Sequence, residues 1–267
     1  MALLFEKRDG IATLTLNRPE ARNALDPETI VELAEAWEAF DKDADLRVAI
    51  ITGRGDAFCS GADLARLIPL LTGARQPETP ADHKLRDNPR LPQIALLRNV
   101  DVTTKPVIAA VNGFAIAGGM ELMQATDLRV AADTAVFALQ EPKWGLFPLG
   151  GSTVRLPRQL PWAIAMEVLL TGERLSAADA ARYGLVNRVV PRDQVMPEAL
   201  KLAQTIVANG PLAVRAIKQS VLACVGRPLA EALQKEIDIG APVFMTEDAR
   251  EGPRAFKEKR KPNFKGR

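Results

Sequence analysis

Three short runs of mainly apolar residues restrict the fold of this chain more than any other feature. They read RVAIITG, KPVIAAV and LRVAA and occupy residues 47–53, 105–111 and 128–132. Short runs dominated by apolar residues are typical of strands buried on both faces. A helix is predicted from about 118 to 126, between the second and third runs. Strand, helix and strand at this spacing predict a layered α/β fold.

The flanking segments extend this pattern. Residues 3–16 alternate as a half-buried hairpin does, around the tight-turn pair Asp9–Gly10. Asp26 followed by Pro27 is typical of a helix start, and an apolar helical face follows it, made of Ile30, Leu33, Ala34, Trp37 and Phe40. Residues 66–100 are polar, proline-rich and aperiodic, so a long loop or a mobile element is expected there. After about residue 160 the chain becomes mainly helical.

Composition excludes several classes of protein. A net charge of +2 is too small to argue for a nucleic-acid partner. Cys59 and Cys224 lie far apart with no CxxC pair, so neither a disulfide framework nor a zinc site is predicted, and no metal is expected. The amino terminus lacks the basic-then-apolar order of a signal peptide, and no run is long enough to span a membrane. We therefore expect a soluble cytoplasmic protein with no membrane partner.

Several familiar catalytic motifs fail. GRGDAF at residues 53–58 begins like a dinucleotide fingerprint but has Phe58 in place of the third glycine. GGSTV at residues 150–154 is not the GxSxG of a nucleophile elbow. His83 is the only histidine and lies in the polar segment, so a solvated role is expected. Apart from His83 the chain has no histidine that could activate Cys59, so Cys59 is expected to be a packed thiol.

Two glycine-rich segments carry the first part of a site. GRGDAFCSGADL at residues 53–64 follows a buried strand, and its glycines let backbone N–H groups face a ligand closely. NGFAIAGGMEL at residues 112–122 leads into a helix, whose first N–H groups have no intrahelical acceptor and lie at the positive end of its dipole. Two such donors aimed at one point would form an oxyanion hole.

Two glutamates form the second part. Glu121 lies in the first turn of the predicted helix, and Glu141 lies 20 residues further on, after the next strand. Alone, Glu121 is explained as an acid at a helix start and Glu141 as an exposed acid before Pro142. Buried together beside an oxyanion hole, they would be natural acid/base partners with pKa values tuned apart.

The order of motifs along the chain resembles the crotonase superfamily, the enoyl-CoA hydratase/isomerase family. The resemblance spans nearly the whole sequence and rests on six segments: TLNRPEARNAL (15–25), AFCSGADL (57–64), KPVIAAVNGFAIAGGMEL (105–122), DLRVAADTAVFALQEPKWGL (127–146), LTGERLSAADAARYGLVNRVV (170–190) and EGPRAFKEKRKPNF (251–264). It implies a spiral core of stacked ββα turns over residues 1–195. A helical C-terminal region over residues 196–267 would then form a homotrimer or a homohexamer.

The resemblance also implies an acyl-CoA thioester substrate, with coenzyme A as part of the substrate and no separate cofactor. The oxyanion-hole donors match Ala62 and Gly118, and the two hydratase glutamates match Glu121 and Glu141. From the family, Glu121 mainly holds and deprotonates water, and Glu141 mainly donates the proton.

Other positions carry weaker expectations. Arg22 and Lys259 match positions where the family contacts CoA, while Asp63 and Asp127 are expected to be structural.

One departure concerns the acyl pocket. Hydratases often read PGxGG after the second glutamate, but this chain reads WGLFPLGG, with Leu149 at the expected glycine. Trp144 and Phe147 lie nearby, and this extra side-chain volume would reshape the pocket.

Three functions remain open. The sequence favours a 2-enoyl-CoA hydratase. An isomerase that moves a 3-enoyl double bond to the 2-position would need only one glutamate, Glu141. A CoA- or RNA-binding protein with little turnover has support only from the basic tail at residues 254–267.

Overall fold

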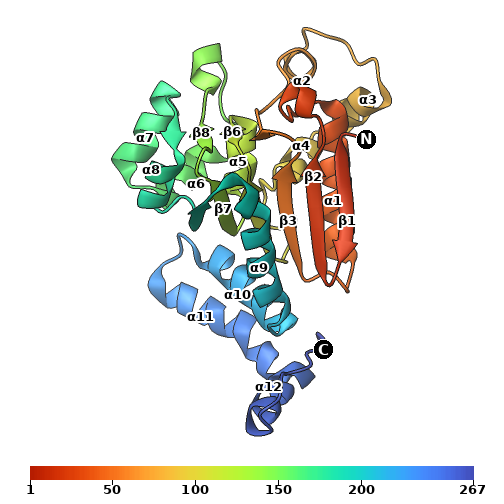
Figure 1. The fold of residues 1–267 in the computed structure, drawn as a ribbon, viewed down its shortest axis with the longest axis vertical. Helices are drawn as coiled ribbons and strands as arrows, with labels where there is room; N and C mark the ends of the chain where they lie inside the picture. Colours follow the sequence, from red (N-terminus) through yellow and green to blue (C-terminus); the bar gives the residue numbers. More distant parts are fainter.

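The computed structural model describes residues 1–267, which form two β-sheets flanked by helices (Figure 1). The larger sheet has six strands in the order β1-β2-β3-β5-β7-β10. Only β1 runs antiparallel to its neighbour, and all the other pairs are parallel. Its strands are β1 (Leu3–Arg8), β2 (Ile11–Leu16), β3 (Val48–Gly53), β5 (Val107–Val111), β7 (Leu128–Ala132) and β10 (Arg188–Val190).

The smaller sheet has four short strands in the order β4-β6-β8-β9, the last pair antiparallel. They are β4 (Ala57–Cys59), β6 (Phe114–Ile116), β8 (Val136–Ala138) and β9 (Leu175–Ser176). Three times in succession the chain places one strand in the large sheet and the next strand in the small sheet: β3 then β4, β5 then β6, and β7 then β8. This repeated turn makes a spiral, as the resemblance implied.

Helices cover the sheets. α1 packs against β1, α3 and α4, and α9 packs against β3, β5 and β7. The helices of the core region are α1 (Pro27–Lys42), α2 (Leu67–Leu71), α3 (Pro80–Asp87), α4 (Leu91–Ala95), α5 (Gly118–Gln124), α6 (Ser152–Gln159), α7 (Trp162–Thr171), α8 (Ala177–Arg182) and α9 (Val195–Val207). Short 3-10 helices are η1 (Pro19–Ala21), η2 (Glu141–Trp144) and η3 (Arg192–Gln194).

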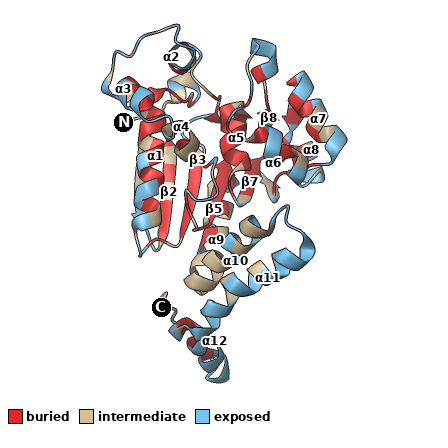
Figure 2. Cartoon of the chain, turned by 180° about the vertical axis from the view of Figure 1, so that it is seen from behind, coloured by how far each residue is buried: buried red, intermediate tan, exposed pale blue.

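The predicted core elements are confirmed. β5 is buried at every residue, as its apolar run predicted, and the buried residues concentrate where the sheets meet the helices (Figure 2). Asp9 and Gly10 both have positive φ in the hairpin turn. Asp26 caps α1 by accepting the Thr29 N–H, and Trp37 is fully buried on the predicted apolar face.

The expectation of a long loop at residues 66–100 is wrong. The segment contains the three helices α2, α3 and α4, and Leu67, Leu85 and Ala95 enter the hydrophobic core. Helix α3 starts with a capping box, in which the Thr79 side chain accepts the Asp82 N–H and the Asp82 side chain accepts the Thr79 N–H. The TPAD sequence carried this signal, but the surrounding polar residues obscured it.

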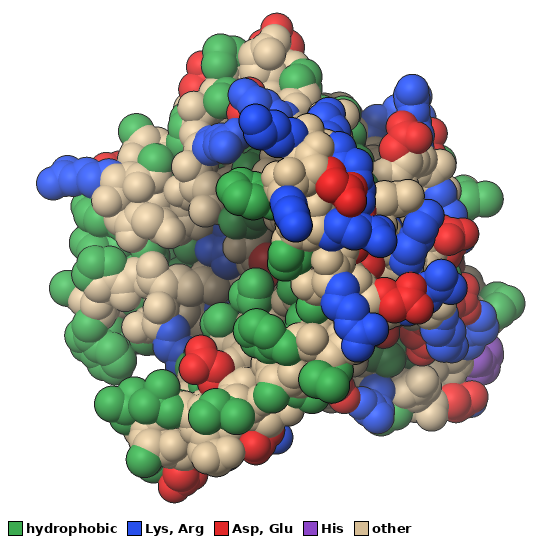
Figure 3. All heavy atoms as spheres, turned by 90° about the horizontal axis from the view of Figure 1, so that it is seen from below, with side chains coloured by type: hydrophobic (Ala, Val, Ile, Leu, Met, Phe, Trp, Pro, Cys, Tyr) green, Lys and Arg blue, Asp and Glu red, His purple; other side chains and the backbone are tan.

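The C-terminal helices project from the core (Figure 1). They are α10 (Pro211–Cys224), α11 (Leu229–Gly240), η4 (Ala241–Met245) and α12 (Glu247–Lys257). No residue of α10 or α11 is buried. Seen from this end, hydrophobic side chains gather on one side of the molecule, whereas Lys and Arg side chains gather on the other (Figure 3). No helix is both long and apolar enough to cross a bilayer.

Candidate active site

The two proposed oxyanion-hole residues lie together. Ala62 follows β4 and pairs with Leu25 in an isolated parallel bridge, in which Leu25 donates to Gly61 and accepts from Asp63. The Ala62 N–H therefore has no acceptor within the protein. Gly118 is the first residue of α5, so its N–H has no intrahelical acceptor. A Cβ built on Gly118 would lie 3.7 Å from the Ala62 nitrogen, which brings both donors to one place.

Backbone constraints hold this arrangement. Ala117 caps α5 with φ 51° and ψ −125°, a conformation that L-residues rarely adopt. Gly61 has φ +95°, and a Cβ there would lie 2.7 Å from the Ala117 Cβ. A Cβ on Gly119 would lie 2.3 Å from the Cys59 carbonyl oxygen, so only glycine lets α5 pack directly on β4. Backbone strain of this kind concentrates at functional sites.

Glu121 lies one turn into α5 and is only 4% exposed. Burial raises the pKa of its carboxyl group, and hydrogen bonds from Ser152 and Gly150 together with the nearby Arg155 charge oppose that rise. The Ser152 N–H donates to Glu121 Oε1 at 3.2 Å. A Cβ on Gly150 would lie 2.5 Å from Glu121 Oε2, so the carboxylate lies directly against that glycine backbone.

Glu141 begins η2, separated from the end of β8 by two residues, and is 8% exposed. Its Oε2 atom is buried and has no hydrogen-bond partner. Burial raises the pKa of Glu141 to about 7, its own backbone N–H opposes the rise, and the neighbouring Glu121 charge adds to it. The interpretation of Glu141 as an exposed acid before Pro142 is therefore wrong, because its side chain is buried and its pKa is raised.

Two arginines fix the segment that faces Glu121. Arg98 Nε donates to the Leu149 carbonyl at 2.9 Å, and Arg155 Nη1 donates to the Gly150 carbonyl at 3.0 Å. Arg155 also donates to the Leu97 carbonyl. The sequence analysis missed this role of Arg155, because no local pattern connects it to Glu121.

The three side chains predicted for the acyl pocket, Trp144, Phe147 and Leu149, are exposed in this chain, Leu149 at 71%. They lie on the segment between Glu141 and Gly150, both of which belong to the site. Arg22 is close as well: its carbonyl accepts the Ser60 N–H at 3.1 Å, and its guanidinium lies over the Phe114 ring.

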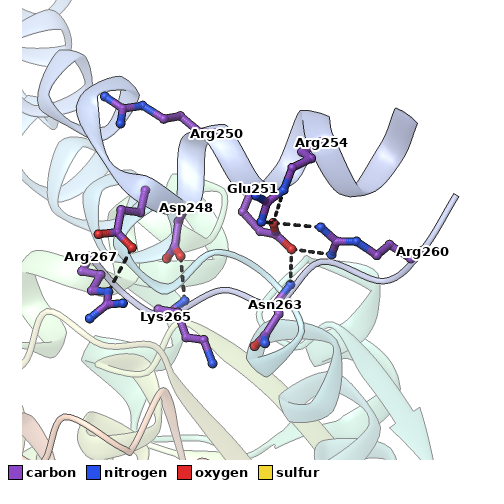
Figure 4. Close-up of a pocket in the computed structure, with 9 residues that line it drawn as sticks. Asp248, Arg250, Glu251, Arg254, Arg260, Asn263, Lys265 and Arg267 are labelled. Atoms are coloured by element: carbon purple, nitrogen blue, oxygen red, sulfur yellow. Dashed lines mark hydrogen bonds and ion pairs between the residues drawn. The ribbon is translucent and has the colours of Figure 1, made fainter. Parts of the chain in front are cut away.

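Lys259 lies elsewhere. It follows α12, on a tail that folds back along this helix (Figure 4). Glu251 accepts from Arg260 and from the Asn263 N–H, and Asp248 accepts the Lys265 and Gly266 N–H groups. Arg47 donates to the Phe264 carbonyl. Since Arg47 immediately precedes β3, the tail lies at the amino end of that strand, opposite the end that leads to β4 and Ala62.

The residues set aside by the sequence analysis are accounted for. Cys59 is fully buried and its pKa is raised to about 12, so it is a packed thiol. His83 is exposed on α3. Asp63 accepts the Ala65 and Arg66 N–H groups, and Asp127 accepts the Val107 N–H and pairs with Lys218, so both are structural.

Comparisons with known proteins show the family to which the chain belongs. A family model described as enoyl-CoA hydratase/isomerase matches residues 6–267. Enoyl-CoA hydratase EchA19 of Mycobacterium tuberculosis is 46% identical over 265 residues, which cover 99% of this chain and 96% of that protein. (E)-benzylidenesuccinyl-CoA hydratase of Thauera aromatica is 40% identical over 268 residues, covering 100% of both. Carnitinyl-CoA dehydratase of Citrobacter koseri is 44% identical over 273 residues, covering 100% of this chain and 99% of that protein.

Solved structures show the same fold. The enoyl-CoA hydratase of Bacillus anthracis superposes with a TM-score of 0.89 at 34% identity, covering 100% of both chains. EchA1 of Mycobacterium marinum superposes with a TM-score of 0.87 at 39% identity, covering 100% of this chain and 99% of that one. The chain therefore belongs to the enoyl-CoA hydratase/isomerase family of enzymes.

Proposed function

We propose that this protein is a 2-enoyl-CoA hydratase that adds water across the 2,3 double bond of an enoyl-CoA thioester. The observation that carries the proposal is a pair of buried glutamates, Glu121 and Glu141, with raised pKa values, beside the unpartnered N–H of Ala62 and the helix-start N–H of Gly118.

The proposed chemistry assigns a task to each group. Attack of water at C3 moves negative charge onto the thioester oxygen, and the Ala62 and Gly118 N–H groups stabilise it. Loss of one such donor typically costs about 3–4 kcal/mol of transition-state stabilisation. One glutamate takes a proton from the water and the other delivers a proton to C2. The reaction needs no separate cofactor, since coenzyme A is part of the substrate.

The environments of the glutamates support the division of roles. Glu121 accepts hydrogen bonds from Ser152 and lies near Arg155, which favour its ionised form and suit a base. Glu141 has an unpartnered oxygen and a pKa of about 7, so near neutral pH it retains a proton to donate. The Glu121 charge adds to the rise in the pKa of Glu141, so the ionisation of one acid affects the other.

The acyl group is proposed to lie against Trp144, Phe147 and Leu149, and CoA against Arg22. The relatives named above act on benzylidenesuccinyl-CoA and carnitinyl-CoA, which differ widely in the acyl part. We therefore propose that the segment between Glu141 and Gly150 selects the acyl group. A panel of short, long and aryl-substituted enoyl-CoAs tests this directly.

We also propose a homotrimer or homohexamer in the cytoplasm. Exposed apolar side chains recur every fourth residue from α10, through the residue that follows it, to α11, which places the helical ones on one face of each helix. They are Ile217, Val221, Val225, Leu229, Leu233 and Ile237. Lys259 would then approach the CoA of another subunit, because its own tail lies at the far end of the sheet. Light scattering after size-exclusion chromatography gives the oligomeric state, and a monomer would contradict the proposal.

The decisive experiment combines variants with substrates. Hydration of crotonyl-CoA and the wider panel is measured for the wild type, Glu121→Gln, Glu141→Gln and the control Glu167→Gln, whose side chain is exposed on α7. Each of the first two substitutions should lower kcat at least about 100-fold, in line with general acid/base catalysis, and the control should not. Fully active variants would refute the mechanism, and a wild type that hydrates no panel member would refute the function.

The alternatives have their own signatures. Solvent-deuterium exchange at C2 and C4 without net hydration would identify an isomerase that uses Glu141 alone. Tight acyl-CoA or RNA binding with negligible turnover would identify a binding protein.

A further inference from the structure

A buried polar pair joins α5 to α6 beside Glu121. Gln124 Nε2 donates a hydrogen bond to Ser152 Oγ at 3.0 Å, although the two residues are 28 positions apart. Gln124 is 1% exposed and Ser152 is fully buried. Burying a polar side chain costs stability unless it is hydrogen-bonded, so the hydrogen bond between these two side chains offsets part of the cost of burying them.

The pair leads to the Glu121 carboxylate. The Ser152 N–H donates to Glu121 Oε1 at 3.2 Å, and the Ser152 hydroxyl lies close enough to this carboxyl group to lower its pKa. An amide nitrogen can only donate, so Ser152 Oγ accepts from Gln124 and its single proton stays free to point toward Glu121. Gln124 therefore sets the direction in which the Ser152 hydroxyl can act on Glu121.

Other charges around Glu121 are few. Arg155 from α6 and Glu141 from η2 are the charged groups whose fields reach it, and Gly150 supplies a further N–H. Gln124 lies three residues after Glu121 on the same face of α5, opposite the first turn of α6, which begins with Ser152. The carboxylate is thus held by α6, and its charge is felt at Glu141.

We propose that Ser152 and Gln124 are positioning residues for Glu121: their directed hydrogen bonds keep its carboxylate ionised and fixed in the orientation a base requires. The inference rests on the proposed role of Glu121 as that base. Hydrogen bonds to a charged acceptor are stronger than hydrogen bonds to a neutral one. Loss of the Ser152 hydroxyl therefore destabilises the ionised form of Glu121 more than its protonated form.

The consequence has a definite sign. A donor to the carboxylate lowers its pKa, so Ser152→Ala raises the pKa of Glu121. A base must be ionised, so the acidic limb of the kcat/KM profile moves to higher pH, by about one pH unit. Gln124→Met leaves the Ser152 hydroxyl in place but removes the hydrogen bond that directs it. The acidic limb of the kcat/KM profile should then move to higher pH by less than in Ser152→Ala. Ser152→Thr keeps the hydroxyl and should restore the wild-type limb.

Two readouts test the proposal. The first is the pH dependence of enoyl-CoA hydration, with KM followed separately because a positioning defect should appear in kcat. The second is the titration of the Glu121 carboxyl, followed by difference infrared spectroscopy with Glu121→Gln as the reference. The control is Ser176→Ala, which removes a cap of α8 and affects stability without facing Glu121.

A raised titration midpoint for Glu121 in Ser152→Ala, with wild-type behaviour in Ser176→Ala, supports the proposal. An unchanged midpoint and an unmoved acidic limb overturn it, even where activity falls. If Ser152→Ala does not fold, Gln124→Met carries the same test. If the wild type hydrates no enoyl-CoA, the proposed function fails, and the infrared titration still decides between the outcomes for Ser152.

Discussion

The raised pKa of Glu141 predicts that removing its charge stabilises the protein at high pH. Burial moves this pKa from 4.5 to about 7. Between these values the folded chain holds a proton that the unfolded chain has released, so stability falls as pH rises through this window. A difference of about 2.5 pH units corresponds to about 3 kcal/mol at about 1.36 kcal/mol per unit.

Glu141→Gln keeps the shape of the side chain and cannot ionise. Relative to the wild type, it should therefore gain about 2–3 kcal/mol of unfolding free energy between about pH 5 and about pH 9. In hydration assays the same variant should lose activity, because glutamine cannot deliver a proton. Stabilisation with loss of function is the pattern expected of a strained active-site acid.

The measurement is urea unfolding of wild type and variant at both pH values and one fixed protein concentration, because an oligomer makes stability concentration-dependent. Glu167→Gln is the matched control on an exposed face of α7. A stability difference between wild type and Glu141→Gln that stays constant with pH would refute the reasoning, since the buried charge would then cost nothing in the folded state.

Three further predictions concern the packing of α5 on β4, the reactivity of the two thiols and a buried ion pair. Gly119→Ala should destabilise the protein by about 2 kcal/mol or more, because its Cβ would lie 2.3 Å from the Cys59 carbonyl oxygen; an unchanged melting temperature would contradict this. Cys224 should react with iodoacetamide in the folded protein near neutral pH while the buried Cys59 does not, as mass spectrometry of the labelled peptides would report. Labelling of both thiols at equal rates would be the opposite result. Asp82→Ala should cost about 3 kcal/mol, since it leaves Arg75 without its partner; denaturant unfolding within about 0.5 kcal/mol of wild type would count against it.

Local patterns in the sequence were sufficient for most of the fold. The continuous apolar runs predicted β3, β5 and β7, and the Asp26–Pro27 pair predicted the start of α1. The same local reasoning failed at residues 66–100, where helices of five to eight residues are too short to show a period. The packing of α3 and α4 against α1, and the burial of Leu67 of α2 in the core, decided what their composition did not.

The sequence predicted which residues form the candidate site, but not how they are arranged. The motifs named Ala62, Gly118, Glu121 and Glu141, and the fold brings the two donors together and buries both acids. The division of the site residues into catalytic and binding roles stays a prediction, as does the boundary after residue 195. Helix α9 bears on that boundary, because Ala199 and Ala203 belong to the main core.

What the sequence determined by itself was the secondary structure that repeats along the chain, because strand propensity and helix capping depend on neighbouring residues. What only the tertiary structure decided was the state of the acids. Ser152 lies 31 positions from Glu121, yet its N–H donates to that carboxylate at 3.2 Å. Desolvation raises the pKa of Glu141 only because the spiral encloses it. Burial and through-space hydrogen bonding depend on the whole fold, so no stretch of sequence could have set them.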